Sequence, residues 1–157
     1  MSAPIAVDAS VIVRYLTGDD KIQSPAAADL FRAAQAGKVK LIVPTATVQE
    51  TVYVLEKLYH FDAAIIAPKL LSLLTLPNVH APDERWLVEA LQFYRVKNSD
   101  FGDALLCAFA RHTGCEVATF DKGILKKFPE IPTFTPSDWL EGKTPKRVKD
   151  GKGGTLN

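Results

Sequence analysis

Short apolar runs alternate along this chain with longer segments of helical periodicity, and this alternation restricts the fold more than any other feature. The strand-like runs cover residues 4–7, 41–43, 78–81, 116–119 and 133–135. Parallel strands need long crossover connections, which are usually helices, so the pattern favours a parallel sheet covered by helices. We therefore expect an α/β fold with a parallel sheet of about five strands flanked by helices.

Capping residues indicate where the intervening helices begin and end. Ser24 precedes Pro25 and Gly37 follows an apolar stripe, a pattern that predicts a helix over 25–36. Asp62 and Gly114 are typical of a helix start and a helix end, respectively. Further helices are expected over residues 10–16, 45–59, 62–76, 83–96, 100–112 and 122–128.

The length of 157 residues, with 47% hydrophobic and 24% charged side chains, is ordinary for one globular domain. We assign residues 1–140 to this domain and residues 141–157 to a flexible basic tail. The net charge is +1, but residues 143–157 hold five Lys and Arg against one Asp, which is +4 and leaves −3 on the remainder. This asymmetry fits a nucleic-acid enzyme with an acidic site, and it fits a solvated tail equally well.

Cysteine and histidine usage argues against a zinc site. Cys107 and Cys115 do not form a C-x-x-C pair, and none of the three histidines stands at ligand spacing from them. No signal peptide is recognised, and no apolar run approaches the ~18 residues of a membrane helix. We therefore expect a cytoplasmic protein with no membrane partner.

Four carboxylates stand beside or inside apolar runs, where an unpaired charge is costly. They are Asp8, Glu50, Asp103 and Asp121. Two carboxylates about 5 Å apart repel by roughly 3 kcal/mol at an effective dielectric near 20. If the fold brings the four together, they are therefore either protonated or bound to a divalent cation.

The first two acids each have a structural explanation as well. Asp8 ends the first strand, at the edge where open α/β sheets bind ligands, with Ser10 as polar support. It equally suits a helix N-cap. Glu50 shares a helical stripe with Tyr53 that we expect to face protein, or else it lies half-exposed at a helix edge.

The remaining acids lie at the starts of helices. Asp100 and Asp103 occupy the first turn of one expected helix, whose positive end favours their ionised forms, so one can cap while the other acts. Asp121 follows a strand, where a turn or a cap explains it as well as a site does. Thr119, two residues earlier, points to the same end of the sheet.

In its arrangement of acids the chain resembles the PIN-domain ribonucleases. The resemblance covers roughly residues 4–140 and is carried by 7–10, Glu50, 100–105 and 119–122. Size and single-domain layout are most similar to the VapC-type toxins of bacterial and archaeal toxin–antitoxin pairs. The acids of the family match Asp8, Glu50, Asp103 and Asp121, with Ser10 and Thr119 as polar support.

The resemblance implies an endoribonuclease that cleaves single-stranded or structured RNA with Mg²⁺ or Mn²⁺ held by these carboxylates. The toxin branch further implies a homodimer and inhibition by a cognate antitoxin. Hard oxygen ligands favour Mg²⁺ or Mn²⁺ over zinc, and such ions can activate water for attack at phosphorus. Asp100 is an additional acid beside the matched one, and the tail is longer than the domain needs. These two departures leave the role of Asp100 and the path of RNA open.

Other enzyme classes fit the chain less well. A dinucleotide-binding domain would need G-x-G-x-x-G after the first strand, where residues 9–12 read Ala-Ser-Val-Ile, and an aspartyl-phosphate phosphatase would need Asp in place of Ser10. An RNA-processing PIN nuclease that is not a toxin and a catalytically inert PIN-like binding module remain as alternatives. The RNA target, the number of metal ions, the antitoxin and the dimer surface are left open.

Overall fold

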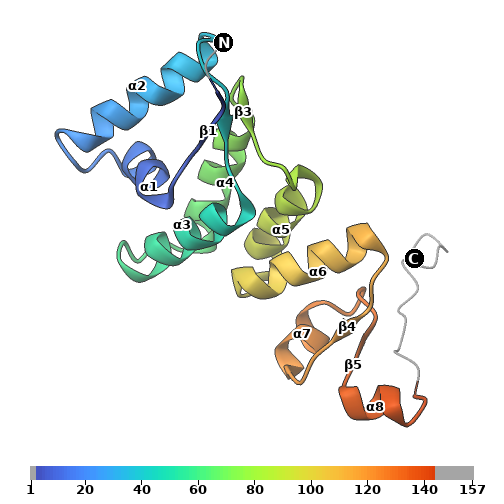
Figure 1. Ribbon diagram of the computed structural model, residues 1–157. Helices are drawn as coiled ribbons and strands as arrows, with labels where there is room; N and C mark the ends of the chain where they lie inside the picture. Colours follow the sequence, from blue (N-terminus) through green and yellow to red (C-terminus); the bar gives the residue numbers. More distant parts are fainter. Residues whose placement is uncertain (1–2, 144–157) are drawn as a thin grey trace.

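The computed structural model describes residues 3–143, and its chain runs through short parallel strands and longer helices (Figure 1). In chain order the elements are β1 (Ile5–Ala6), α1 (Ala9–Thr17), α2 (Gln23–Gln35), β2 (Leu41–Ile42), α3 (Thr45–Lys57), α4 (Ala63–Leu74), β3 (Val79–His80), α5 (Glu84–Lys97), α6 (Phe101–Thr113), β4 (Val117–Ala118), α7 (Lys122–Lys127), β5 (Thr133–Phe134) and α8 (Pro136–Leu140). The predicted basic tail lies, except for residues 141–143, outside the described residues.

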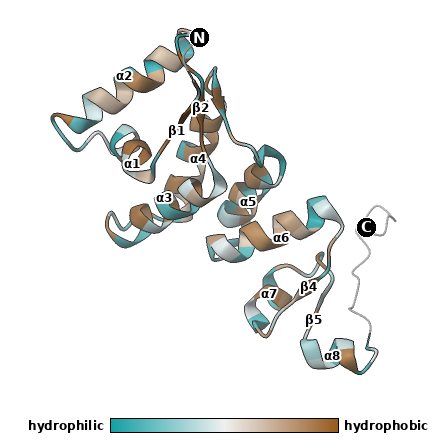
Figure 2. Cartoon of the chain, viewed as in Figure 1, coloured by the Kyte–Doolittle hydropathy of each residue, from teal (hydrophilic) through white to brown (hydrophobic). Residues whose placement is uncertain are grey.

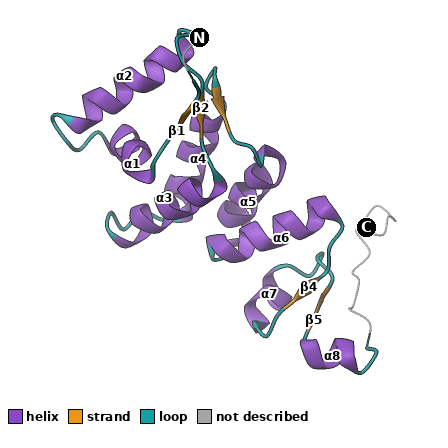
Figure 3. Ribbon diagram, viewed as in Figure 1, coloured by secondary structure: helices purple, strands orange, loops and turns teal. Residues whose placement is uncertain are grey.

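All five expected strands form, but they are divided between two parallel sheets. One sheet has the order β1-β2-β3, with Ile5 opposite Leu41 and Leu41 opposite Val79, and the other consists of β4 and β5 (Figure 3). The prediction of one sheet of about five strands is therefore wrong for the single chain. Sequence patterns locate strands, whereas pairing depends on how the connecting helices pack.

The helices follow their predicted positions closely, with one difference at a helix start and one additional helix. Asp62 and Gly114 cap α4 and α6 as expected. Ser24 does not cap α2, because the Asp20 carboxylate accepts hydrogen bonds from the N–H groups of Ile22 and Gln23 and starts the helix earlier. Helix α8 was not expected; Thr135 caps it by accepting from the Asp138 N–H at 3.2 Å.

One apolar core joins the larger sheet to the helices around it, and the apolar residues of the helices gather on their inner faces (Figure 2). Helix α1 packs against α2 and α3, α4 packs against α5, and α5 packs against α6. The largest side chains of this core with no exposed surface include Ile12, Phe31, Leu41, Leu55, Leu70 and Leu91. Each such side chain stabilises the fold by about 1.5–3 kcal/mol relative to an exposed one.

A set of contacts fastens the segment after α6 to the C-terminal end of α5, and we call this set the α5–α7 latch. The rings of Phe93 and Phe128 meet edge to face at 5.4 Å, and the Lys97 ammonium pairs with Glu130 at 2.7 Å. Lys97 Nζ also donates to the Lys127 carbonyl at 2.9 Å, while Lys127 Nζ donates to the Asn98 carbonyl at 2.8 Å. Because Phe128 is buried, the latch holds β4, α7 and β5 in one orientation relative to α5.

No helix among the described residues is long and apolar enough to cross a membrane.

Candidate active site

Asp8 lies at the carboxyl end of β1 and caps α1. It therefore occupies the sheet edge and also serves as a helix N-cap, the two positions that the sequence indicated. Its Oδ2 atom accepts hydrogen bonds from the Ser10 hydroxyl at 2.6 Å and from the Ser10 N–H at 3.0 Å. These bonds to the charged form hold the pKa of Asp8 below its usual value, the hydroxyl contributing most. Ser10 therefore favours the ionised form of Asp8, in which both carboxylate oxygens can accept further contacts.

Glu50 joins Asp8 at a pocket of about 250 Å³ between α1 and α3. The expectation that its stripe faces protein is wrong for the single chain, because Glu50 and Tyr53 are both exposed. The buried face of α3 is the neighbouring one, which carries Val48, Thr51, Val52 and Leu55. A carboxylate on the exposed side of the helix is free to bind a cation in the pocket without the cost of full burial.

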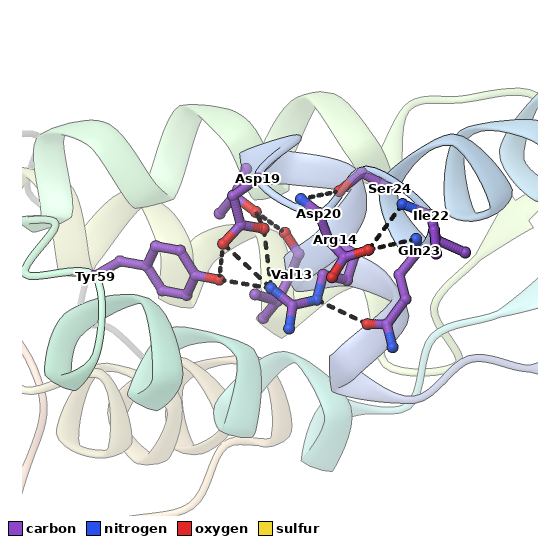
Figure 4. Close-up of polar contacts among 9 residues, drawn as sticks. Val13, Arg14, Asp19, Asp20, Ile22, Gln23, Ser24 and Tyr59 are labelled. Carbon is purple, nitrogen blue, oxygen red and sulfur yellow. Dashed lines mark hydrogen bonds and ion pairs between the residues drawn. The ribbon is translucent and has the colours of Figure 1, made fainter.

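Arg14 also lines this pocket and forms hydrogen bonds with several polar side chains (Figure 4). Its Nε donates to Gln23 Oε1 at 2.9 Å, and its Nη1 donates to Asp19 at 3.0 Å and to the Tyr59 hydroxyl at 3.2 Å. The Tyr59 hydroxyl in turn donates to Asp19 at 2.6 Å. The network ties α1 to the start of α2 and to the end of α3, and it holds a guanidinium beside Ser10.

Sequence reasoning missed Arg14, although a usable signal was present. Arg14 follows Ser10 by four residues, so both side chains emerge from the same face of α1. An Arg one turn after Ser10, on the helix that a sheet-edge Asp caps, is a residue type that commonly binds phosphate oxygens.

The Arg14 network makes a testable contribution to stability. Its hydrogen bonds, the one from Tyr59 first, lower the pKa of Asp19 from 3.8 to about 2. A lowered carboxyl pKa contributes stability above the unfolded value of 3.8, and this contribution is lost as the pH falls through about 2. We therefore expect Asp19→Asn to lower the unfolding temperature at pH 7, with the two proteins converging near pH 2. Asp29→Asn, at an exposed ion pair on α2, is the matched control and should change little; equal unfolding temperatures of Asp19→Asn and the parent at pH 7 would contradict the assignment.

The second group of acids lies at the start of α6 and after β4. Asp100 caps α6 by accepting from the Asp103 N–H at 3.2 Å. Burial raises the pKa of Asp103, the charges of Asp100 and Asp121 raise it further, and Lys127 opposes them. Asp103 and Asp121 are therefore electrostatic neighbours, although they come from different elements.

Asp121 is held by its own local contacts. It caps α7 by accepting from the Gly123 N–H at 2.7 Å, and its own N–H donates to Thr119 Oγ1 at 2.9 Å. Thr119 thus orients the turn that carries Asp121.

Within one chain the four acids form two pairs rather than one cluster. The pocket that holds Asp8 and Glu50 is lined by neither Asp103 nor Asp121. Among residues 3–143, no three His, Cys, Asp or Glu side chains are grouped closely enough to hold a metal ion. The start of α6 does reach α3, since a Cβ placed on Gly102 would lie 3.6 Å from Gln49 Nε2, one residue before Glu50.

The donor chemistry fits a hard divalent cation. All four candidate ligands are carboxylates, which suit Mg²⁺ or Mn²⁺. Burial and the neighbouring charges of Asp100 and Asp121 raise the pKa of Asp103, and a cation relieves the part that is repulsion. Asp8, in contrast, is already kept ionised by Ser10.

Comparison with known proteins identifies the family. The family model described as PIN domain matches residues 5–131, which includes β1 to α7 and all four candidate acids. No curated protein matches the chain significantly. PIN domains are generally metal-dependent nucleases, in agreement with the carboxylate chemistry of both pairs. Because the match covers most of the 157 residues, the chain belongs to the PIN domain family.

Proposed function

We propose that this protein is an endoribonuclease that depends on Mg²⁺ or Mn²⁺ and cleaves single-stranded or structured RNA. The observation that carries the proposal is the carboxylate of Asp103, partly buried and close to the charges of Asp100 and Asp121, inside a chain of the PIN domain family. Burial and neighbouring like charges both disfavour the ionised form of Asp103 unless a cation binds there. A binding module that catalyses no reaction would gain nothing from this electrostatic destabilisation.

In this proposal Asp8, Glu50, Asp103 and Asp121 are the ligands of the metal. When bound, the ion supplies an activated water and stabilises the negative oxygens of the phosphate under attack. The chain positions the ligands: Ser10 orients Asp8 with two hydrogen bonds, and Asp100 fixes the first turn of α6 that carries Asp103. The positive N-terminal end of α6 favours the ionised form of Asp103.

Arg14 has a separate role in the proposal. Its guanidinium lines the pocket with Asp8 and Glu50, and Gln23 and Asp19 fix its orientation. A fixed guanidinium pre-organises a phosphate contact, so Arg14 would hold the RNA backbone beside the acids.

We further propose that the protein is the toxin of a type II toxin–antitoxin pair in the cytoplasm, inhibited by a cognate antitoxin and acting as a homodimer. The support is the similarity of size and layout to VapC-type toxins. An RNA-processing PIN nuclease that is not a toxin is the second candidate. A short neighbouring reading frame encoding a DNA-binding antitoxin would favour the toxin, and its absence would favour RNA maturation.

The test of the proposed function is cleavage of end-labelled RNA with Mn²⁺ and with a chelator. We expect internal cuts that require the metal, and we expect an intact substrate when the chelator is present. The substrates should include an unstructured RNA and a stem-loop, because the structure does not select between them. Cleavage that persists undiminished with chelator would contradict metal dependence, and no cleavage of either RNA would favour the inert binding module.

A further inference from the structure

Strands β1 and β4 each lie at the edge of a parallel sheet, and the outer side of each presents backbone groups to which a parallel strand could pair. In β1 and just beyond it, the N–H groups of Ile5 and Val7 donate to carbonyls of the neighbouring strand. Successive residues of a strand point to opposite edges, so the N–H and carbonyl of Ala6 face outward. In the second sheet, the N–H groups of Val117 and Thr119 donate to carbonyls of the β5 strand and the residue before it. The N–H and carbonyl of Ala118 therefore face the open edge.

The two edges cannot meet within this arrangement of one chain. Helices α3, α5 and α6 separate the sheets in Figure 3, and the α5–α7 latch holds β4 and β5 against the end of α5. Helix α5 packs on α4 and is thereby part of the larger body. Pairing β4 with β1 of the same chain would require the buried Phe128 to leave Phe93 and the Lys97–Glu130 ion pair to break.

Exposed apolar side chains flank both edges. Ile5 of β1 is 40% exposed, and Phe120, which follows β4, is 79% exposed. Helix α6 presents Leu106 and Phe109 to solvent at a helical spacing, and α3 presents Tyr53. Single exposed apolar residues are common, but Ile5 lies in β1 and Phe120 directly follows β4, so these two accompany the unpaired strand edges.

We propose that two copies of this chain exchange their β4–β5 segments, so that β1 of each copy pairs in parallel with β4 of the other. The occupant is a second copy because each copy offers one β1 edge and one β4 edge. A two-fold pair therefore closes the β1 and β4 edges of both copies, with two equivalent joints. A foreign strand would close one edge and leave the other open.

The exchange completes the acidic site, and in this respect the inference rests on the proposed function. Parallel strands end at the same edge of a sheet, and neighbouring strands lie about 4.8 Å apart. Asp8 follows Ala6 by two residues and Asp121 follows Ala118 by three, so both lie at that edge. Asp103 belongs to α6, which leads directly into β4, and it is the electrostatic neighbour of Asp121 in the same chain. Each site then consists of Asp8 and Glu50 from one copy with Asp103 and Asp121 from the other.

Complementation between inactive variants tests this arrangement. Asp8→Asn and Asp103→Asn should each be inactive alone, because both sites of each dimer carry the change. Co-refolded in equal amounts, they should recover about a quarter of the parent rate, since half of the dimers are mixed and each holds one intact site. Asp103→Asn mixed with Asp121→Asn is the matched control and should recover nothing, because every site then lacks one acid.

The outcomes separate the two proposals. An inactive parent protein overturns the proposed function, whereas an active parent without recovery in the first mixture overturns the exchange. Recovery in the first mixture alone supports the exchange.

Cross-linking gives a readout that does not depend on activity or metal. In a Cys115→Ser background, Ala6→Cys and Ala118→Cys chains are mixed, refolded and oxidised; Cys107 stays buried. Paired strands place the two Cα atoms within the range that a disulfide spans. We expect a covalent dimer from the mixture and none from either variant alone. A single chain that carries both Ala6→Cys and Ala118→Cys is oxidised in parallel. If its disulfide closes within one chain, or if no disulfide forms in this chain or in the mixture, the exchange is wrong.

Discussion

Asp103→Asn is expected to reduce metal-dependent RNA cleavage by at least about a hundredfold, because it removes a ligand of the cation that activates water. Asp100→Asn is expected to stay within a few-fold of the parent. The structure supplies the reason for the difference, since Asp100 caps α6 and asparagine caps a helix nearly as well. Initial cleavage rates at saturating Mn²⁺ measure both effects.

Two controls show whether the variants fold normally and whether the loss of an unrelated surface charge changes the rate. Far-UV circular dichroism should be the same for both variants and the parent, because neither change removes buried apolar surface. Asp29→Asn alters a surface carboxylate on α2 and should leave the rate unchanged. The opposite order, with Asp100→Asn inactive and Asp103→Asn active, would show that the ligand and the cap are assigned the wrong way round.

Mn²⁺ is expected to raise the unfolding temperature of the parent protein by roughly 5–10 °C at a hundredfold excess over its Kd. A ligand that binds only the folded state stabilises it by about 2.7 kcal/mol at that excess, and a chain of this length gains about 2–4 °C per kcal/mol. Since protons compete with the metal for carboxylate oxygens, the gain should shrink as the solution becomes acidic. Thermal unfolding with chelator and with Mn²⁺, at pH 7.5 and near pH 5, measures it.

Asp103→Asn should separate the repulsion from the metal binding. The raised pKa of Asp103 means that its ionised form is disfavoured in the folded state, so the ionised group lowers stability at neutral pH. The variant without metal should therefore be at least as stable as the parent at pH 7, and this difference should vanish below about pH 4, where the carboxyl is protonated in both states. It should also lose most of the gain with Mn²⁺. If Mn²⁺ stabilises neither protein, the carboxylates do not bind a metal and the inert module becomes the better interpretation.

Local features of the fold were predictable because they depend on neighbours in sequence. Asp62 begins α4 and Gly114 ends α6 as expected, and Asp8 and Asp100 serve as caps, one of the alternatives that their positions indicated. The failures of local prediction had local causes as well. At α2, the Asp20 carboxylate binds the N–H groups of Ile22 and Gln23, so the helix begins before the position at which Ser24 could cap it.

Helical periodicity did not predict the environment of Glu50 correctly. A stripe containing Ala46, Tyr53 and Val54 looks apolar enough to face protein, yet Glu50 and Tyr53 are exposed on α3. Several faces of α3 carry apolar residues, and the choice among them depends on where α1 and the sheet lie. That information is absent from the helix itself.

The type and order of the elements from β1 to β5 were predictable from local patterns, and the pattern of acids indicated the PIN domain family. The division of the strands into sheets of three and two, and of the acids into two pairs, was not. The physical reason is that capping and periodicity act over a few residues, whereas strand pairing depends on distant contacts. Here those contacts are the packing of α5 on α6 and the latch between Phe93 and Phe128, which hold β4 away from β1.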